Sequence, residues 1–232
     1  MKIAILSDIH GNLEAFEAVL EDVDKKGVKA IYCCGDVVGY GANPCEVIEL
    51  LRKRNITCVQ GNHDRAILNI QEQSGFGRDA QTVLDWTRKQ LGTENFLAGL
   101  PLVLEQENIV FAHANVVSPE KFSYLDYRGE RLTPGFIDGT FLGENLRRIK
   151  AGQTLFIGHT HVPFKISVDG KTICNVGSVG QPRNGDRRAG YYLFDEKNLE
   201  PVRVEYDIKT AARKIKEAGL PGYLGDRLSF GL

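Results

Sequence analysis

The stretch Gly61-Asn62-His63-Asp64 follows a short apolar run at 56–59, and the rest of the chain can be interpreted outward from it. An amide, an imidazole and a carboxylate stand there in consecutive positions, beside a glycine that permits close approach of the backbone. In α/β proteins, binding and catalytic groups gather where buried strands end. The stretch therefore predicts a functional loop at the end of a buried strand.

Similar polar clusters end three other apolar, strand-like runs. Asp8-Ile9-His10 follows residues 2–6, Gly35-Asp36 follows 30–34, and Gly158-His159-Thr160-His161 follows 154–157. The chain has five histidines, and each stands at the end of an expected strand: His10, His63, His113, His159 and His161. A single histidine of this kind is usually a packing residue. The shared placement of all five favours one common site.

Composition narrows the class of protein. The chain has 232 residues, 42% of them hydrophobic and 25% charged, as expected for a globular chain of one or two domains. The net charge of −1 and the lack of a long basic run argue against a nucleic-acid partner and favour a small or moderate-sized substrate. No stretch approaches the roughly 18 apolar residues of a membrane span, so we expect no membrane partner.

The cysteines bear on the cellular compartment. There are five of them, without Cys-x-x-Cys spacing, and Cys33, Cys34, Cys58 and Cys174 lie in apolar, strand-like runs. These features favour buried, reduced thiols over disulfides or a zinc knuckle. We therefore expect a cytoplasmic protein.

The pattern of elements predicts an α/β fold. Strands and amphipathic helices alternate in the first half, which is typical of a parallel sheet covered on both faces. In the last third, Asp169-Gly170 predicts a hairpin, and runs at 191–194 and 202–206 continue in antiparallel style. We expect this last third to form a second sheet packed on the first half. Residues 1–232 are expected to form a single domain, with a lid or substrate insert at 115–141 and an amphipathic helix near 208–218.

The side chains at the strand ends suggest a pair of metals. There are seven candidate ligands, namely Asp8, His10, Asp36, Asn62, His113, His159 and His161. Seven exceed what a single zinc site uses, which suggests two metals with one carboxylate shared. Two divalent ions and two carboxylates leave net positive charge, which suits a phosphate ester. The mixed nitrogen and oxygen set suits Mn, Fe, Zn, Ni or Co better than an all-oxygen Ca or Mg site.

These clusters, in this order and at these strand ends, resemble the signature of the calcineurin-like metallophosphoesterase superfamily. The later run at 175–183 is similar to a substrate loop of small prokaryotic phosphoesterases related to diadenosine tetraphosphatases. The sequence departs from the family pattern at Ala114-Asn115 and Val176. The resemblance implies a two-sheet α/β/β/α sandwich of the metallophosphoesterase type.

The resemblance also implies roles for individual residues. Asp8, His10 and His161 would hold one metal, Asn62, His113 and His159 the other, and Asp36 would bridge the two. His63 would stay unligated and assist the leaving group, while Asn62 would also contact the phosphate. Arg183 and Tyr40 are the expected substrate-binding residues. Manganese is the favoured ion, with Fe, Zn, Ni, Co or Mg as alternatives.

The implied activity is hydrolysis of a phosphate monoester or diester by attack of a metal-activated hydroxide. One alternative is a dinucleoside polyphosphate (pyrophosphate) hydrolase, so the small phosphorylated substrate could be a nucleotide. Another is a non-catalytic, metal-loaded binding module, although such a module would have no need of His63.

Several residues have a simpler structural interpretation. Asp64 is expected to cap a following helix, and Arg187 and Arg188 are expected to lie on a solvated face. Tyr40 either lines the pocket or packs in its loop. The aromatic residues of the insert, Phe122, Tyr124 and Tyr127, either stack on a nucleobase or pack within a lid.

Overall fold

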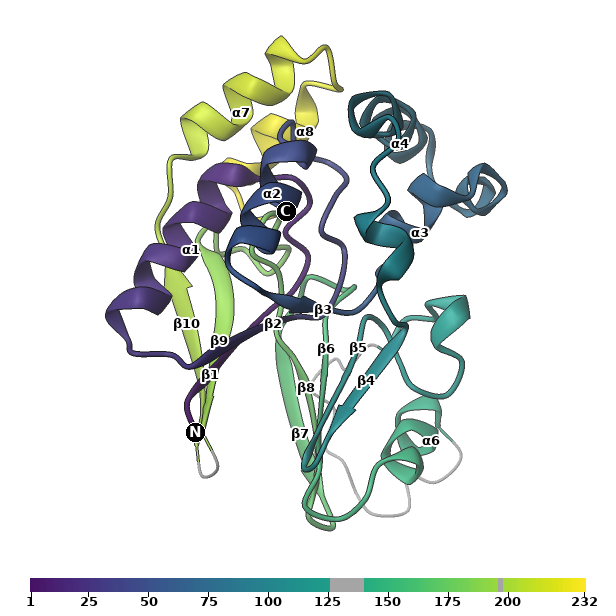
Figure 1. The fold of residues 1–232 in the computed structure, drawn as a ribbon, viewed down its shortest axis with the longest axis vertical. Helices are drawn as coiled ribbons and strands as arrows, with labels where there is room; N and C mark the ends of the chain where they lie inside the picture. The colour runs from purple at the N-terminus through teal and green to yellow at the C-terminus, as the bar shows by residue number, and fades with distance from the viewer. Residues whose placement is uncertain (126–139, 196–197) are drawn as a thin grey trace.

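The computed structural model describes residues 1–125, 140–195 and 198–232. Most of the insert expected at 115–141, including Tyr127, therefore lies outside the described residues. Figure 1 shows the arrangement of the elements around two sheets of five strands each.

The first sheet has the order β10-β9-β1-β2-β3. Its strands are β1 (Ile3–Leu6), β2 (Ala30–Cys33), β3 (Thr57–Cys58), β9 (Ala189–Asp195) and β10 (Asn198–Val204). β1, β2 and β3 pair in parallel, whereas β9 pairs antiparallel with both β1 and β10. The carboxyl ends of β1, β2 and β3 therefore lie at one edge.

The second sheet has the order β4-β5-β6-β8-β7. Its strands are β4 (Val103–Gln106), β5 (Ile109–Ala112), β6 (Thr154–Ile157), β7 (Phe164–Val168) and β8 (Lys171–Asn175). β5, β6 and β8 are parallel neighbours, and the β7–β8 hairpin turns at Asp169-Gly170 as predicted.

Helices cover the outer faces of the two sheets. They are α1 (Leu13–Lys25), α2 (Pro44–Lys53), α3 (Asn62–Leu68), α4 (Arg78–Leu91), α6 (Phe141–Arg148), α7 (Ile208–Glu217) and α8 (Tyr223–Asp226), with short 3₁₀ turns between some of them. In Figure 1, α1 and α7 run side by side at the upper left, and α6 lies at the lower right beside the second sheet.

Alternation along the strands explains the layers, since successive side chains point to opposite faces of a sheet. Leu6 of β1 packs outward in one core with α1, α2 and α4, while Ile5 points inward to the core between the sheets. In the second sheet, Phe111 and Phe156 point inward, and Leu155 packs outward in a core with α6. The layers are helix, sheet, sheet and helix, which confirms the predicted α/β/β/α sandwich.

Two expectations about the strands were wrong in part. β9 and β10 do not join a second sheet with the β7–β8 hairpin but return to pair with β1 in the first sheet. Short-range pattern identifies strands, but only tertiary packing selects their partners. The third strand is also shorter than the apolar run at 56–59, since it covers only Thr57–Cys58 and the N–H of Gln60 instead bonds to the Pro101 carbonyl.

No helix among the described residues is long and apolar enough to cross a membrane. All five cysteines carry free thiols, and Cys33, Cys34, Cys58 and Cys174 are buried, as the sequence predicts.

Candidate metal centre

The seven candidate ligands predicted from the sequence lie together where the two sheets meet. Asp8 and His10 follow β1, Asp36 follows β2 and Asn62 begins α3 after β3. From the second sheet, His113 follows β5, and His159 and His161 follow β6. Parallel pairing within each sheet brings the carboxyl ends of these strands to one edge.

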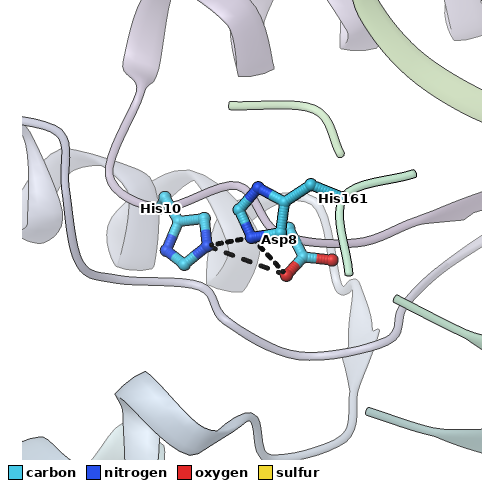
Figure 2. Close-up of side chains that lie close together, drawn as sticks. All are labelled: Asp8, His10 and His161. Carbon is cyan, nitrogen blue, oxygen red and sulfur yellow. Dashed lines mark hydrogen bonds and ion pairs between the residues drawn. The ribbon is translucent and has the colours of Figure 1, made fainter. Parts of the chain in front are cut away.

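One group of donors contains Asp8, His10 and His161, all buried. The Nε2 atoms of His10 and His161 are 3.1 Å apart, and His161 Nε2 lies 3.3 Å from Asp8 Oδ1. Figure 2 shows the three side chains pointing toward one another.

A second group contains Asn62, His113 and His159. His113 Nε2 lies 2.9 Å from Asn62 Oδ1 and 3.1 Å from His159 Nδ1. The amide oxygen of Asn62 is also 2.9 Å from His159 Nδ1. Three atoms that could coordinate a metal ion therefore face a common point.

Asp36 stands between the two groups. Its Oδ2 lies 3.6 Å from His10 Nε2 and 3.3 Å from His113 Nε2. Its other oxygen, Oδ1, accepts a hydrogen bond from the backbone N–H of His63 at 2.9 Å. That bond at the start of α3 orients the carboxylate so that Oδ2 faces both groups.

Backbone contacts fix the tautomers of three imidazoles. The Nδ1 atoms of His10, His113 and His161 lie 3.2, 2.7 and 2.6 Å from the backbone carbonyls of Val38, Cys34 and Gln181. Because a carbonyl oxygen can only accept, each Nδ1 carries a hydrogen, and Nε2 is the ring atom that faces the cluster.

The orientation of the acceptor atoms shows whether the cluster suits a cation. The Nε2 lone pairs of His10 and His161 oppose each other at 3.1 Å, beside Asp8 Oδ1, a buried atom with no hydrogen-bond partner. Acceptors in such an arrangement repel one another unless a positive charge lies among them. The residues therefore fit divalent metal ions, and both groups of donors offer the nitrogen and oxygen ligands such ions take.

The pKa values of the imidazoles follow from burial and from Asp36. Burial lowers the pKa of His63 to about 4 and that of His159 to about 3, and it holds the pKa of His10 well below its usual range. Burial also acts to lower the pKa of His113, but the charge of Asp36 outweighs it and raises that pKa to about 9. A positive charge between His113 and Asp36 is thus favoured.

The carboxyl groups of the site differ in the direction in which their pKa values shift. Burial acts to raise the pKa of Asp8 and of Asp36, but neighbouring histidines outweigh it and hold both below their usual range. Burial, followed by the charge of Asp36, raises the pKa of Asp64 to about 7. Asp64 lies in the first turn of α3, and its Oδ2 accepts a hydrogen bond from the backbone N–H of the N-cap residue Gly61 at 2.9 Å. It therefore caps α3 from within, and not a following helix as predicted.

The backbone at the site is unusual. Five candidate ligands have positive φ angles between 52° and 68°, a region that residues other than glycine seldom adopt: Asp8, His10, Asp36, His159 and His161. Conformations of this kind cluster at functional sites, where the surrounding structure holds them in place.

His63 lies in the first turn of α3 and is almost fully buried. Its ring is edge-on to those of His10 and Phe76 and tilted against Tyr40, with centroid distances of 4.8, 4.9 and 4.7 Å. Its Nδ1 is buried without a hydrogen-bond partner. One ligand atom each of His63, His10 and Asp36 lies within 4.8 Å of the others.

A cavity of about 160 Å³ opens over these side chains. Its lining includes His63, together with Tyr40 and Arg183, the two residues expected to bind substrate. The Arg183 guanidinium lies 5.6 Å from the centroid of the Tyr40 ring and donates a hydrogen bond to Gln181 Oε1 at 2.8 Å. The two residues predicted for substrate binding therefore contact each other at one wall.

Two aromatic residues complete the cavity walls. Phe76 lines the cavity and contacts the His63 ring. The sequence does not predict it as a site residue, because it lies outside the strand-end motifs and reaches His63 only through the fold. Tyr124 lies over His159, with ring centroids 4.2 Å apart, and its side chain is 64% exposed. Phe122 meets His113 edge-on at 5.9 Å. Two aromatic residues of the insert, Phe122 and Tyr124, therefore lie beside candidate metal ligands, as stacking on a bound nucleobase requires.

Comparison with known proteins identifies relatives of the chain. An uncharacterized protein of Methanocaldococcus jannaschii is 42% identical and covers 99% of this chain and 98% of its own length. The phosphodiesterase YfcE of Escherichia coli is 24% identical over 87% of this chain and 91% of the relative.

Solved structures agree on the fold. A metallophosphoesterase from Sphaerobacter thermophilus has a TM-score of 0.80 at 32% identity, with all of both chains covered. A hypothetical protein from Pyrococcus horikoshii has a TM-score of 0.83 at 24% identity, covering 100% of this chain and 98% of its own. The family model described as a calcineurin-like phosphoesterase superfamily domain matches residues 1–199. The chain therefore belongs to the calcineurin-like phosphoesterase superfamily.

Proposed function

We propose that this protein hydrolyses phosphate monoesters or diesters at a centre of two divalent metal ions. The observation that carries the proposal is the position of Asp36 Oδ2, between a nitrogen donor of each group and beside a cavity that contains His63. The Escherichia coli relative is named as a phosphodiesterase, which supports hydrolysis of phosphate diesters.

The candidate ligands divide between two ions. Asp8, His10 and His161 would hold one ion, Asn62, His113 and His159 the other, and Asp36 would bridge them. Divalent ions bound by these residues would supply a nucleophile near neutral pH, because such ions lower the pKa of bound water. Manganese is the favoured ion, and the donors also suit Fe, Zn, Ni, Co or Mg.

The protein's own groups would orient and protonate the substrate. His63 forms part of the cavity wall beside the candidate metal ligands, so it is placed to donate a proton or a hydrogen bond to the leaving oxygen. The side-chain NH₂ of Asn62 could donate to a phosphate oxygen while its carbonyl faces the metal. Arg183 places a positive charge at the same wall.

A reconstitution assay tests the proposal. Metal-stripped protein is reloaded with Mn²⁺ and assayed with an aryl phosphate monoester and the matching diester, with His63→Ala alongside. Turnover that depends on both metal and His63 supports the enzyme, and the ratio of the two rates separates phosphatase from phosphodiesterase. Two bound metals without turnover of either ester would favour the non-catalytic binding module.

Dinucleoside polyphosphates are a second candidate substrate class. Tyr124 and Phe76 line the cavity and offer aromatic faces to a base.

We also propose a cytoplasmic location and a single domain over residues 1–232. The buried free thiols support the cytoplasmic location.

A further inference from the structure

The run at 175–181 crosses from the second sheet to the first beside the candidate metal centre. It begins at Asn175, the last residue of β8, and its Gly180 N–H donates to the Asp8 carbonyl at 2.9 Å. Its polar side chains are buried. Among the described residues that line the cavity, this part of the chain contributes only Arg183. The run is therefore placed to support the site, although it resembles a substrate loop in sequence.

The Asn175 side chain is fully buried and bonds to the loop that carries two candidate ligands, the histidine loop (158–161). Its Nδ2 donates to the Gly158 carbonyl at 2.6 Å and to Thr160 Oγ1 at 3.0 Å. Gly158 precedes His159, and Thr160 separates His159 from His161. One amide group therefore contacts the loop before its first histidine and again between the two.

The amide oxygen of Asn175 is also engaged. It accepts a hydrogen bond from the Gly177 N–H at 2.9 Å, in a turn where Gly177 has a φ of 76°. The turn leads to Ser178, whose Oγ donates to the Asp8 carbonyl at 2.8 Å. Asn175 thus connects the histidine loop of the second sheet to a turn that reaches a candidate ligand of the first.

The backbone of the histidine loop depends on such support. His159 and His161 have φ angles of 68° and 60°, in the left-handed region, and such conformations persist only where the surrounding structure holds them. A Cβ on Gly158 would lie 1.8 Å from Ser7 Oγ, so the loop is also packed tightly against the end of β1. A shift of this loop would move His159 and His161 together, and these belong to different donor groups.

We propose that Asn175 is a positioning residue for both metal ions, which holds His159 and His161 in place through its hydrogen bonds to the histidine loop. This inference rests on the proposed function, in which the two histidines bind separate ions. Asn175 is fully buried, so it acts through the histidines and not on the substrate. Groups that orient metal ligands typically contribute about 10- to 100-fold to metal affinity.

Asn175→Asp tests this role with little change in shape. The substitution replaces the donor NH₂ by an oxygen, which would oppose the Gly158 carbonyl that now lies 2.6 Å from Nδ2. Isothermal titration of Co²⁺ into the metal-stripped full chain gives the number of ions and their affinities. The visible absorption of bound Co²⁺ reports its coordination geometry. We expect both affinities to fall by about tenfold or more, and the absorption spectrum to change.

Gln153→Glu is the matched control. Gln153 is another buried amide that bonds to two backbone groups, since it accepts from the Lys150 N–H at 2.8 Å and donates to the Glu107 carbonyl at 3.0 Å. It precedes β6, whereas the histidine loop follows that strand. The same amide-to-acid change at this end should lower the melting temperature of the metal-free chain but leave both Co²⁺ affinities unchanged.

Thr160→Val provides a second variant of the same contact. It removes the hydroxyl that accepts from Asn175 and leaves the bond to Gly158, so the Co²⁺ affinities should fall by less than in Asn175→Asp. Circular dichroism melting establishes that each variant is folded, and Thr160→Val serves as the test if Asn175→Asp does not fold. Unchanged affinities and spectrum in the folded test variant, or an equal loss of affinity in Gln153→Glu, would overturn the positioning role.

Co²⁺ binding is measured without substrate, so the result is independent of turnover. A chain that binds two ions through Asn175 but hydrolyses no ester would retain the positioning role and refute the enzyme. Metal-dependent hydrolysis of aryl esters, with Co²⁺ affinities that Asn175→Asp does not change, would do the reverse.

Discussion

Gly61 lies so close to Asp36 that any side chain at position 61 would collide with the carboxylate. An ideal Cβ on Gly61 would stand 2.0 Å from Asp36 Oδ1 and 2.3 Å from the Asp36 backbone nitrogen. The glycine that precedes Asn62 is therefore required by the position of the central carboxylate.

Gly61→Ala should displace the Asp36 carboxylate, and with it the oxygen between the two donor groups. We expect a large loss of bound metal, measured as ions per chain by elemental analysis, and of aryl phosphate hydrolysis. Gly99→Ala is the matched control, because a Cβ at Gly99 meets no atom within 4 Å. Normal metal content in Gly61→Ala would show that Asp36 can move without consequence.

Asp36→Asn should deplete both metal positions, since the substitution removes the negative charge that faces a donor of each group. Elemental analysis should find fewer than two ions per chain. Asp85→Asn, which changes an exposed carboxylate paired with Arg88, should retain the wild-type content. Two ions per chain in Asp36→Asn would exclude the bridging role.

His63→Ala should keep its metals and lose activity. Removal of a general acid typically lowers turnover by about 10²- to 10⁴-fold, and His63 lies at the cavity wall beside the donors. Steady-state rates and metal content measured on the same sample decide its role. Unchanged turnover would remove His63 from the mechanism, whereas lost metal would make it a ligand.

Chelation should lower the melting temperature of the wild type. A ligand at 100 times its Kd stabilises the native state by about 2.7 kcal/mol. For a chain of this size that corresponds to roughly 5–10 °C per site. Differential scanning calorimetry with and without chelator measures the shift, which should be much smaller in Asp36→Asn. An identical wild-type melting temperature in both conditions would argue against bound metal.

Asp186 provides a pH-dependent prediction away from the metal centre. Hydrogen bonds from the Arg188 guanidinium lower the pKa of Asp186 from 3.8 to about 2. Because the folded-state pKa is depressed, the stabilisation is present above about pH 4 and is lost as the pH falls toward 2. Arg188→Gln should return the pKa of Asp186 toward 3.8 in an NMR titration, and Arg213→Gln should not. The pair is largely exposed, so global stability should change little.

The sequence predicted the candidate donors well because each follows a strand end, and strand ends are local features. A short apolar run, a polar residue and a nearby glycine are readable from neighbouring positions, and they identify Asp8, Asp36 and His113 as candidate donors. The turn at Asp169-Gly170 was equally local, since two residues suffice to specify it.

Other features, namely strand pairing and some cavity contacts, depend on which distant segments of the chain pack together. β9 and β10 have a clear strand pattern, but their pairing with β1 spans nearly the whole chain and carries no short-range signal. Phe76 likewise reaches His63 only through the fold.

By itself, the sequence determined the superfamily, the sandwich and the chemical types gathered at the strand ends, because these follow from local periodicity and ordered motifs. Only the tertiary structure decided that Asp36 Oδ2 faces both donor groups and that β9 returns to pair with β1. Distances between side chains remote in sequence depend on how the two sheets pack and where the chain returns, and no local pattern encodes that packing.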